Sequence, residues 1–139
     1  MGMIRYVIAT HGKLAEGFLS ALQLFVGDQY SIETICAFLD EESLEKKANK
    51  ILSQYTSDDE VIIMTDMYGG SVNQFFTKEM LLGNNYHVIT GINLGLTVEL
   101  ILCLQTPVEE IQIKSIIQQA KDQIVYMNQV LPSLQTGED

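Results

Sequence analysis

His11 is the residue whose type and position are best suited to chemistry. It follows an apolar run at residues 4–9 and precedes a glycine, so we expect its imidazole at the exposed end of a strand. An imidazole in that place can act as a nucleophile. Taken alone, a loop histidine without a role is an equally good interpretation. The second histidine, His87, lies at the amino-terminal end of another predicted strand, and we expect it to be structural.

Asp66 is the second candidate, because it directly follows the apolar run at residues 61–65. Its carboxylate is expected at the rim of the core, where a charge needs a partner. A carboxylate that accepts a hydrogen bond from one imidazole nitrogen fixes the tautomer and leaves the lone pair of the other nitrogen free. Such a contact would make His11 a better nucleophile. The alternative is that Asp66 only caps the helix that follows it.

The sequence Gly69-Gly70-Ser71 opens a predicted helix and is a candidate anion site. Backbone N–H groups and the positive helix end attract a phosphate, and glycines let it approach the main chain. Such glycines are common in turns, so this signal is weak alone. A histidine nucleophile beside an anion site, without metal ligands or a second catalytic base, indicates phosphoryl transfer through a phosphohistidine.

The elements that must position these residues follow from the period of the apolar positions. Short β-rich runs alternate with segments of helical spacing, which predicts an α/β fold: a doubly wound, three-layer sandwich around a four-stranded parallel sheet. The predicted strands are residues 4–9, 32–38, 61–65 and 86–90. The predicted helices are one with a stripe of Leu14, Phe18, Leu22 and Phe25, one carrying Leu44, Ala48, Ile51, Leu52 and Tyr55, and residues 71–82, 96–105 and 109–123.

Ligands of such sheets bind beyond the carboxyl ends of the strands. The loops that begin at Thr10, Asp66 and Gly91 follow the first, third and fourth strands, so they converge if these strands are neighbours. Residues 124–131 are predicted to be either a helix end or an edge strand. They contain six apolar side chains and no charge.

Composition limits the class of protein further. The chain has 139 residues, of which 47% are hydrophobic, and we expect one domain over residues 1–139. A formal net charge of -10 argues against nucleic acid and anionic membrane surfaces as partners. No apolar run reaches the roughly 18 residues of a membrane span. Cys36 and Cys103 lie in apolar runs, so we expect buried free thiols and a cytoplasmic location.

Three segments resemble a known family: VIATHGKLAEGF at residues 7–18, TDMYGGSVN at 65–73 and ITGINL at 89–94. They are similar to the enzyme IIA domains of the mannose class of the bacterial phosphoenolpyruvate:sugar phosphotransferase system (PTS). The resemblance implies that His11 is phosphorylated, that Asp66 is its carboxylate partner and that the Gly69 to Ser71 backbone lies at the phosphate. With Thr10 added, the expected phosphate contacts are Thr10, Gly69, Gly70 and Ser71. We expect no metal and no cofactor.

The same resemblance implies partners and an assembly. The phosphoryl group would come from the phosphocarrier protein HPr and pass to a histidine of a separate IIB component, with the membrane components IIC and IID choosing the sugar. A homodimer would exchange an antiparallel edge strand within residues 124–131. Members of the family commonly have proline where this chain has Val72 and Gly95. Those two differences concern partner specificity and loop stiffness.

Three other interpretations compete with this one. A receiver domain would phosphorylate Asp66, but it needs acidic residues for Mg²⁺ after the first strand, where this chain has Thr10 and His11. A histidine phosphatase or mutase needs an arginine and a second histidine beside the first, and neither is in place. The third is a regulatory module that binds a protein partner according to its phosphorylation state without passing the group onward. The sequence does not separate that module from a carrier.

Overall fold

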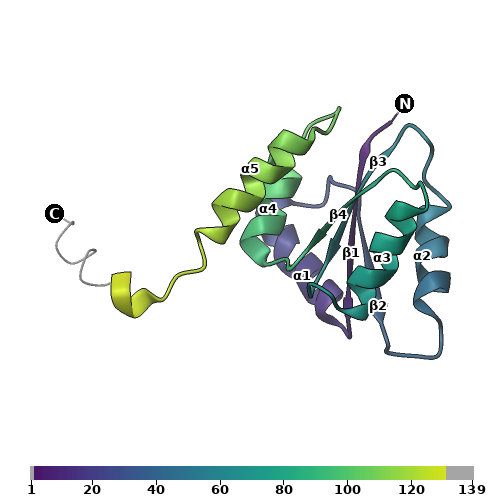
Figure 1. Cartoon of the computed structure of the whole chain (residues 1–139), viewed down its shortest axis with the longest axis horizontal. Helices are drawn as coiled ribbons and strands as arrows, with labels where there is room; N and C mark the ends of the chain where they lie inside the picture. Colours follow the sequence, from purple (N-terminus) through teal and green to yellow (C-terminus); the bar gives the residue numbers. More distant parts are fainter. Residues whose placement is uncertain (1, 131–139) are drawn as a thin grey trace.

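The structure, a computed structural model, describes residues 2–130 and contains four strands and five helices in that range. In chain order they are β1 (Ile4–His11), α1 (Leu14–Val26), β2 (Ile32–Ala37), α2 (Leu44–Leu52), β3 (Glu60–Thr65), α3 (Ser71–Leu81), β4 (Tyr86–Thr90), α4 (Leu94–Cys103) and α5 (Glu110–Lys121). All strand pairs are parallel and the order is β2-β1-β3-β4 (Figure 1). β1, β3 and β4 are therefore neighbours, as predicted, and their carboxyl ends lie at the same end of the sheet.

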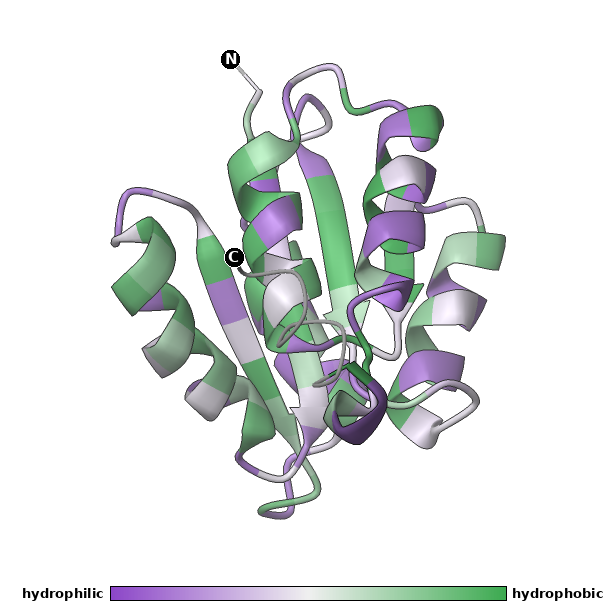
Figure 2. Ribbon diagram, turned by 90° about the vertical axis from the view of Figure 1, so that its left-hand side faces the viewer, coloured by the Kyte–Doolittle hydropathy of each residue, from purple (hydrophilic) through white to green (hydrophobic). Residues whose placement is uncertain are grey.

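Helices cover both faces of the sheet, which confirms the three-layer prediction. One buried cluster joins α1, α4 and α5 to side chains such as Ile8 and Ile62, and the other joins α2 and α3 to Val7 and Ile63. Successive residues of β1 and β3 thus enter opposite layers, as the pleat of a strand requires. Hydrophilic and hydrophobic residues are mixed along the helices in Figure 2, as expected of amphipathic elements.

Side-chain caps explain where two of the helices begin. Ser43 Oγ accepts from the N–H of Lys46 at the start of α2, and Asn93 Oδ1 accepts from the N–H of Leu96 at the start of α4. Each bond satisfies an N–H that has no partner inside its helix. The Asn93 cap places the start of α4 at Leu94, two residues before the predicted start.

The predicted apolar stripe of α1 is partly wrong. Leu22 is buried as expected, but Leu14 and Phe25 are largely exposed, and the buried positions are Ala15, Leu22 and Val26. Both sets fit the spacing of a helix, and they differ by a rotation about its axis. The N–H of Ala15 donates to the buried hydroxyl of Thr10, and this contact turns Ala15 toward the sheet.

The expectation of two buried thiols is also wrong. Cys36 is half-buried, and Cys103, the last residue of α4, is exposed. An apolar run in a helix places some of its members on the solvent side, so membership of the run did not fix burial. None of the helices among residues 2–130 combines the length and hydrophobicity that crossing a membrane requires.

The carboxy-terminal segment does not form a strand in this chain. Residues 124–126 belong to no element and residues 127–130 form one helical turn, which stands away from the sheet at the yellow end of the chain (Figure 1). The expected edge strand is therefore not confirmed, and Leu131 lies outside the described residues. Ile124, Tyr126 and Met127 are exposed.

Asp59 directly precedes β3, at the amino-terminal ends of the strands, and is a structural carboxylate. It accepts hydrogen bonds from the N–H groups of Thr56 and Met3 and from Arg5 Nε, at 2.9, 3.0 and 3.2 Å. The backbone hydrogen bond from Thr56, followed by that from Met3, outweighs burial, so the pKa of Asp59 is lowered. A lowered carboxyl pKa means that the ionised group stabilises the folded chain.

We expect Asp59→Asn to lower the melting temperature at pH 7. The stabilisation is complete above the ordinary aspartate pKa of about 3.9 and is lost as the pH falls through the lower folded-state value. The difference between variant and wild type should therefore shrink below pH 4, which thermal unfolding at several pH values measures. Asp58→Asn, at an exposed neighbour, is the control. Equal melting temperatures at pH 7 for Asp59→Asn and wild type would contradict this role.

Candidate functional site

The site is built on the carboxyl ends of the two central strands. His11 is the last residue of β1 and Asp66 directly follows β3, and these strands pair with Ala9 opposite Thr65. Parallel pairing therefore brings the two side chains to the same edge, as the sequence predicts. The backbone N–H and the ring Nδ1 of His11 both bond to Asp66 Oδ2, each at 2.9 Å.

This double contact favours the ionised form of Asp66 and fixes the tautomer of the neutral His11 ring. Burial raises the pKa of Asp66, but the hydrogen bonds from the backbone and ring of His11 outweigh it, so the carboxyl pKa lies below its usual value. An ionised carboxylate can only accept hydrogen bonds, so Nδ1 carries a proton. Nε2 of the neutral ring then holds the lone pair. The helix-cap alternative is not what the structure shows, because the bonds that other residues donate to this carboxylate come from His11.

The free ring nitrogen faces α3. Ser71 Oγ lies 3.3 Å from His11 Nε2, and the His11 side chain is 40% exposed. The hydroxyl can donate to the lone pair of Nε2 in the resting protein. After phosphorylation the same hydroxyl is within reach of a phosphoryl oxygen on that nitrogen. Ser71 therefore lies where the sequence places it.

The glycines before Ser71 act differently from the prediction. The N–H of Gly69 donates to Asn73 Oδ1 at 2.9 Å, and the N–H of Gly70 donates to the carbonyl of Met67 at 3.0 Å. Both are used to close the turn and are not free to hold an anion, which corrects the expectation for these two groups. The free donors are instead those of the first helical turn of α3, whose N-cap residue supplies no side-chain bond.

Gly70 has another structural reason to be glycine. A Cβ atom built on it would lie 3.3 Å from His11 Cε1 and 3.2 Å from the carbonyl oxygen of Met67. Contacts of that length are tighter than side chains normally make. The missing side chain therefore lets the imidazole lie against the turn.

Thr10 does not reach the site with its side chain. It is fully buried, and its hydroxyl accepts from the N–H of Ala15 at 2.8 Å. The expected phosphate contact is corrected, because this hydroxyl caps α1 and points into the protein. Asn93, in the third predicted loop, likewise caps α4. The contacts that converge at His11 therefore come from the loops after β2 and β3.

Phe38 is a residue of the site that the sequence analysis missed. Its ring centroid lies 5.4 Å from that of His11, with 39° between the planes. The predicted second strand ended at residue 38, and an aromatic residue there gave no sign that its ring turns toward another strand. Val72, where the family commonly has proline, is fully buried against the sheet.

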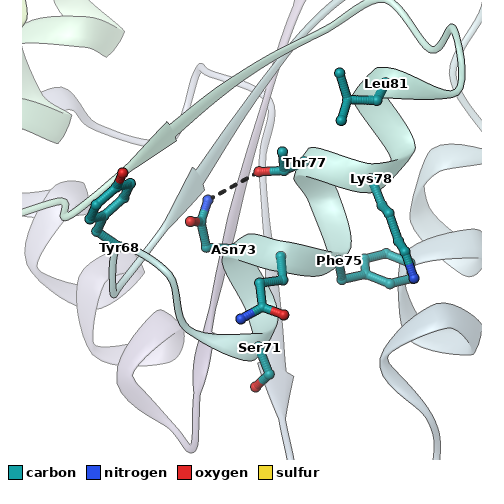
Figure 3. A pocket seen from close by; sticks show the side chains of 8 residues that line it. Tyr68, Ser71, Asn73, Phe75, Thr77, Lys78 and Leu81 are labelled. Carbon is teal, nitrogen blue, oxygen red and sulfur yellow. Dashed lines mark hydrogen bonds between the residues drawn. The ribbon is translucent and has the colours of Figure 1, made fainter.

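A hollow of about 590 Å³ runs along α3 beside the site (Figure 3). Its lining residues are Tyr68, Ser71, Asn73, Gln74, Phe75, Thr77, Lys78 and Leu81. Ser71 joins it to the site, but His11 and Asp66 are not part of the lining. The histidine therefore lies outside this hollow. Among residues 2–130, no three His, Cys, Asp or Glu side chains are grouped so that they could hold a metal ion.

We expect Ser71→Ala to slow phosphorylation of His11 by about 10- to 150-fold, because a hydrogen bond to a charged group contributes about 1.5–3 kcal/mol. The fold should persist, since the Ser71 side chain is exposed. Stopped-flow or quench measurements with a phosphorylated donor protein test this expectation. Ser53→Ala, at the exposed end of α2, is the matched control. Wild-type rates for Ser71→Ala would show that the Ser71 hydroxyl does not contribute to phosphorylation of His11.

Fold and site together define a class: a doubly wound α/β protein with a carboxylate-oriented histidine at the carboxyl edge of a parallel sheet. Residues 5–120 match the family described as "PTS system fructose IIA component". The chain therefore belongs to the IIA components of the fructose and mannose branch of the PTS, which confirms the resemblance found in the sequence.

Individual relatives agree with the family. The mannose-specific EIIAB component of Escherichia coli (strain K12) is 30% identical over 101 residues, which are 71% of this chain and 31% of that protein. The match therefore spans about a third of the length of that relative. A crystal structure of a protein assigned as a phosphoenolpyruvate-dependent sugar PTS permease from Klebsiella pneumoniae has 32% identity and a TM-score of 0.84, over 93% of this chain and 94% of that one.

A PTS IIA protein associated with the fucose utilization operon of Streptococcus pneumoniae is 25% identical, with a TM-score of 0.73 over 92% of this chain and 96% of that one. The mannose/sorbose-specific IIA subunit of Enterococcus faecalis is 21% identical with a TM-score of 0.69, over 89% and 94% of the two chains. At that identity the likeness shows the fold alone. These folds confirm the predicted α/β class.

Proposed function

We propose that this chain is a cytoplasmic phosphoryl carrier that accepts the group on His11 Nε2 from HPr and passes it to a IIB component. The observation that carries the proposal is the double hydrogen bond from His11 to Asp66, which in the neutral ring leaves the lone pair on Nε2 of a partly exposed imidazole. Residues 1–139 would act as one IIA domain. The mannose-specific name of the Escherichia coli relative supports a mannose-class sugar as the final acceptor.

The proposed transfer uses one lone pair and one leaving group. Nε2 of His11 attacks the phosphorus of the donor's phosphohistidine, an N–P bond to His11 forms, and the donor's N–P bond breaks. The bonding pair returns to the donor imidazole. The phosphorylated ring gains positive character while its Nδ1–H stays bonded to Asp66, so the carboxylate stabilises the charge that develops. Ser71 and the first turn of α3 face the phosphoryl oxygens.

The surface around His11 favours protein partners. Leu14, Phe38, Leu39, Met67 and Tyr68 are all exposed and follow β1, β2 and β3 at the same edge of the sheet. Exposed apolar side chains gathered in one place mark interaction surfaces. A carrier must dock two different proteins over the same histidine, one after the other, and this apolar rim gives both a common surface.

Reconstitution tests the relay. Phosphoenolpyruvate, enzyme I and HPr should label the chain, and a cognate IIB component added afterwards should remove the label and carry it. The regulatory alternative predicts a different result, because label would stay on this chain while a protein partner binds only one of the two forms. Retention of label in the presence of a functional IIB component would contradict the carrier.

We also propose that the chain is a homodimer that exchanges residues 124–131 across a two-fold axis. Two observations support it: the apolar side chains at 124–127 are exposed, and β4 pairs only with β3 among the described residues, leaving one edge open. An unpaired apolar edge promotes aggregation unless it is covered. Exchange would cover both edges in one isologous interface.

Truncation before Ile124 is therefore expected to give a monomer or an aggregate in light scattering, and to abolish phosphoryl transfer. The full chain should be a dimer at micromolar concentration. A chain ending at residue 134 keeps the whole segment and serves as the control. A monodisperse and active monomer from the truncation before Ile124 would refute both the exchange and its link to the site.

A further inference from the structure

Phe38 has a backbone conformation that its residue type rarely adopts. Its φ is 66°, and among the described residues it is the only one other than glycine with a positive φ. In this region the side chain of an L-residue crowds its own backbone, and a bulky residue there is a genuine outlier. Such conformations persist when the surrounding structure enforces them, and they concentrate at functional sites.

The chain on both sides of Phe38 is held in place. The carbonyl of Ala37 accepts from the N–H of Gly12 at 2.9 Å, which ties the end of β2 to the loop after β1. The ammonium of Lys47, on α2, donates to the carbonyl of Cys36 at 2.6 Å and lies 3.1 Å from Asp40 Oδ1. These contacts fix the backbone before and after Phe38. They enforce its left-handed conformation.

Burial in the core does not account for this conformation. The Phe38 side chain is 60% exposed and belongs to neither buried cluster. Its aromatic contact is the imidazole of His11, and the centroid distance of 5.4 Å is within the range of interacting aromatic pairs. β2 and β3 flank β1, so Phe38 approaches His11 from one neighbouring strand and Gly70 from the other.

We propose that Phe38 is a positioning residue for His11, which it holds between Asp66 and Ser71 while shielding the phosphorylated ring from water. The proposal rests on the proposed phosphorylation of His11. In the hydrolysis that it would limit, a water oxygen attacks phosphorus, the N–P bond breaks and its electron pair returns to Nε2. The products are inorganic phosphate and unmodified histidine. An apolar ring beside the imidazole removes one path for that water.

Phe38→Gly is the informative variant. Glycine adopts a φ near 66° without strain, so the fold should be kept and thermal stability should not fall. We expect the phosphorylated variant to hydrolyse faster by about three- to tenfold, since the aromatic contact is lost. The readout is spontaneous hydrolysis measured without HPr or IIB, because Phe38 also belongs to the apolar rim and its loss affects docking. A purely structural role for Phe38 would not change the hydrolysis rate of a folded protein.

Three further variants complete the experiment. Phe38→Asn also tolerates the left-handed region and replaces the glycine variant if that one fails to fold. Phe38→Tyr keeps the ring and should restore the wild-type lifetime. Leu24→Ala removes an exposed apolar side chain near the carboxy-terminal end of α1, outside the rim around His11, and should leave the lifetime unchanged. Wild-type hydrolysis and transfer rates in a folded Phe38→Gly or Phe38→Asn protein would overturn the proposal.

A second measurement separates this proposal from the proposed function. The ring carbon-bound protons of His11 in the unphosphorylated protein should shift when the Phe38 ring is removed, and should stay near wild type in Phe38→Tyr. Unshifted signals would overturn the positioning role whatever the phosphorylation assay shows. A protein that shows these shifts but never accepts a phosphoryl group would count against the carrier function and leave the ring contact intact.

Discussion

His11→Ala is expected to abolish phosphorylation of the chain by phosphoenolpyruvate, enzyme I and HPr. Nε2 is the acceptor in the proposed transfer, and alanine offers no lone pair in its place. Wild-type protein should carry label that is labile in acid and stable in base, as a phosphohistidine is. The variant should carry none while its circular dichroism and melting temperature remain close to wild type, because the imidazole is partly exposed.

His87→Ala is the matched control for that experiment. His87 lies near the amino-terminal end of β4, at the opposite edge of the sheet from the site. Its replacement should leave labelling unchanged. Full labelling of His11→Ala would contradict the assignment of His11 as the phosphorylated residue, and so would loss of label in a folded His87→Ala protein.

Asp66→Asn is expected to leave the fold intact and to slow phosphoryl transfer by about 10² to 10⁴, the range that acid–base and electrostatic partners contribute. The amide carries no charge to stabilise the positive character of the phosphorylated ring. It can also donate a hydrogen bond to Nδ1, which would favour the tautomer with the proton on Nε2. Rapid-quench kinetics with phosphorylated HPr would measure the loss.

Asp28→Asn, at an exposed position beyond α1, tests whether the loss of one negative charge is sufficient by itself to slow phosphoryl transfer. It should transfer at the wild-type rate. A wild-type rate for Asp66→Asn would instead reduce Asp66 to a structural residue that only orders the end of β1 through the N–H of His11.

The sequence predicted the sheet well because burial leaves a clear pattern in its central strands. The apolar run at 61–65 differs from β3 by one residue, and the run at 86–90 coincides with β4. Once the strands were placed, the parallel topology was sufficient to bring His11, Asp66 and Ser71 together. That part of the site depends on which residues end a strand or begin a helix, and both are visible in the sequence.

The predictions that the structure corrects concern the direction in which single polar groups point. Thr10 and Gly69 lie beside the site, but the hydroxyl of one and the N–H of the other are taken by local caps and turns. Such bonds depend on backbone angles that residue types do not specify. The left-handed conformation of Phe38 is of the same kind, because the contacts on either side of it come from Gly12 and Lys47, which lie elsewhere in the chain.

Nuclear magnetic resonance of the phosphorylated protein, with ¹⁵N-labelled histidines, tests the central claim most directly. Coupling of phosphorus to a ring nitrogen identifies both the residue and the atom that carries the group. The structure predicts one phosphoryl group on Nε2 of His11, with Nδ1 still protonated and bonded to Asp66. A phosphoryl group on Nδ1 of His11, on His87 or on Asp66 would contradict it.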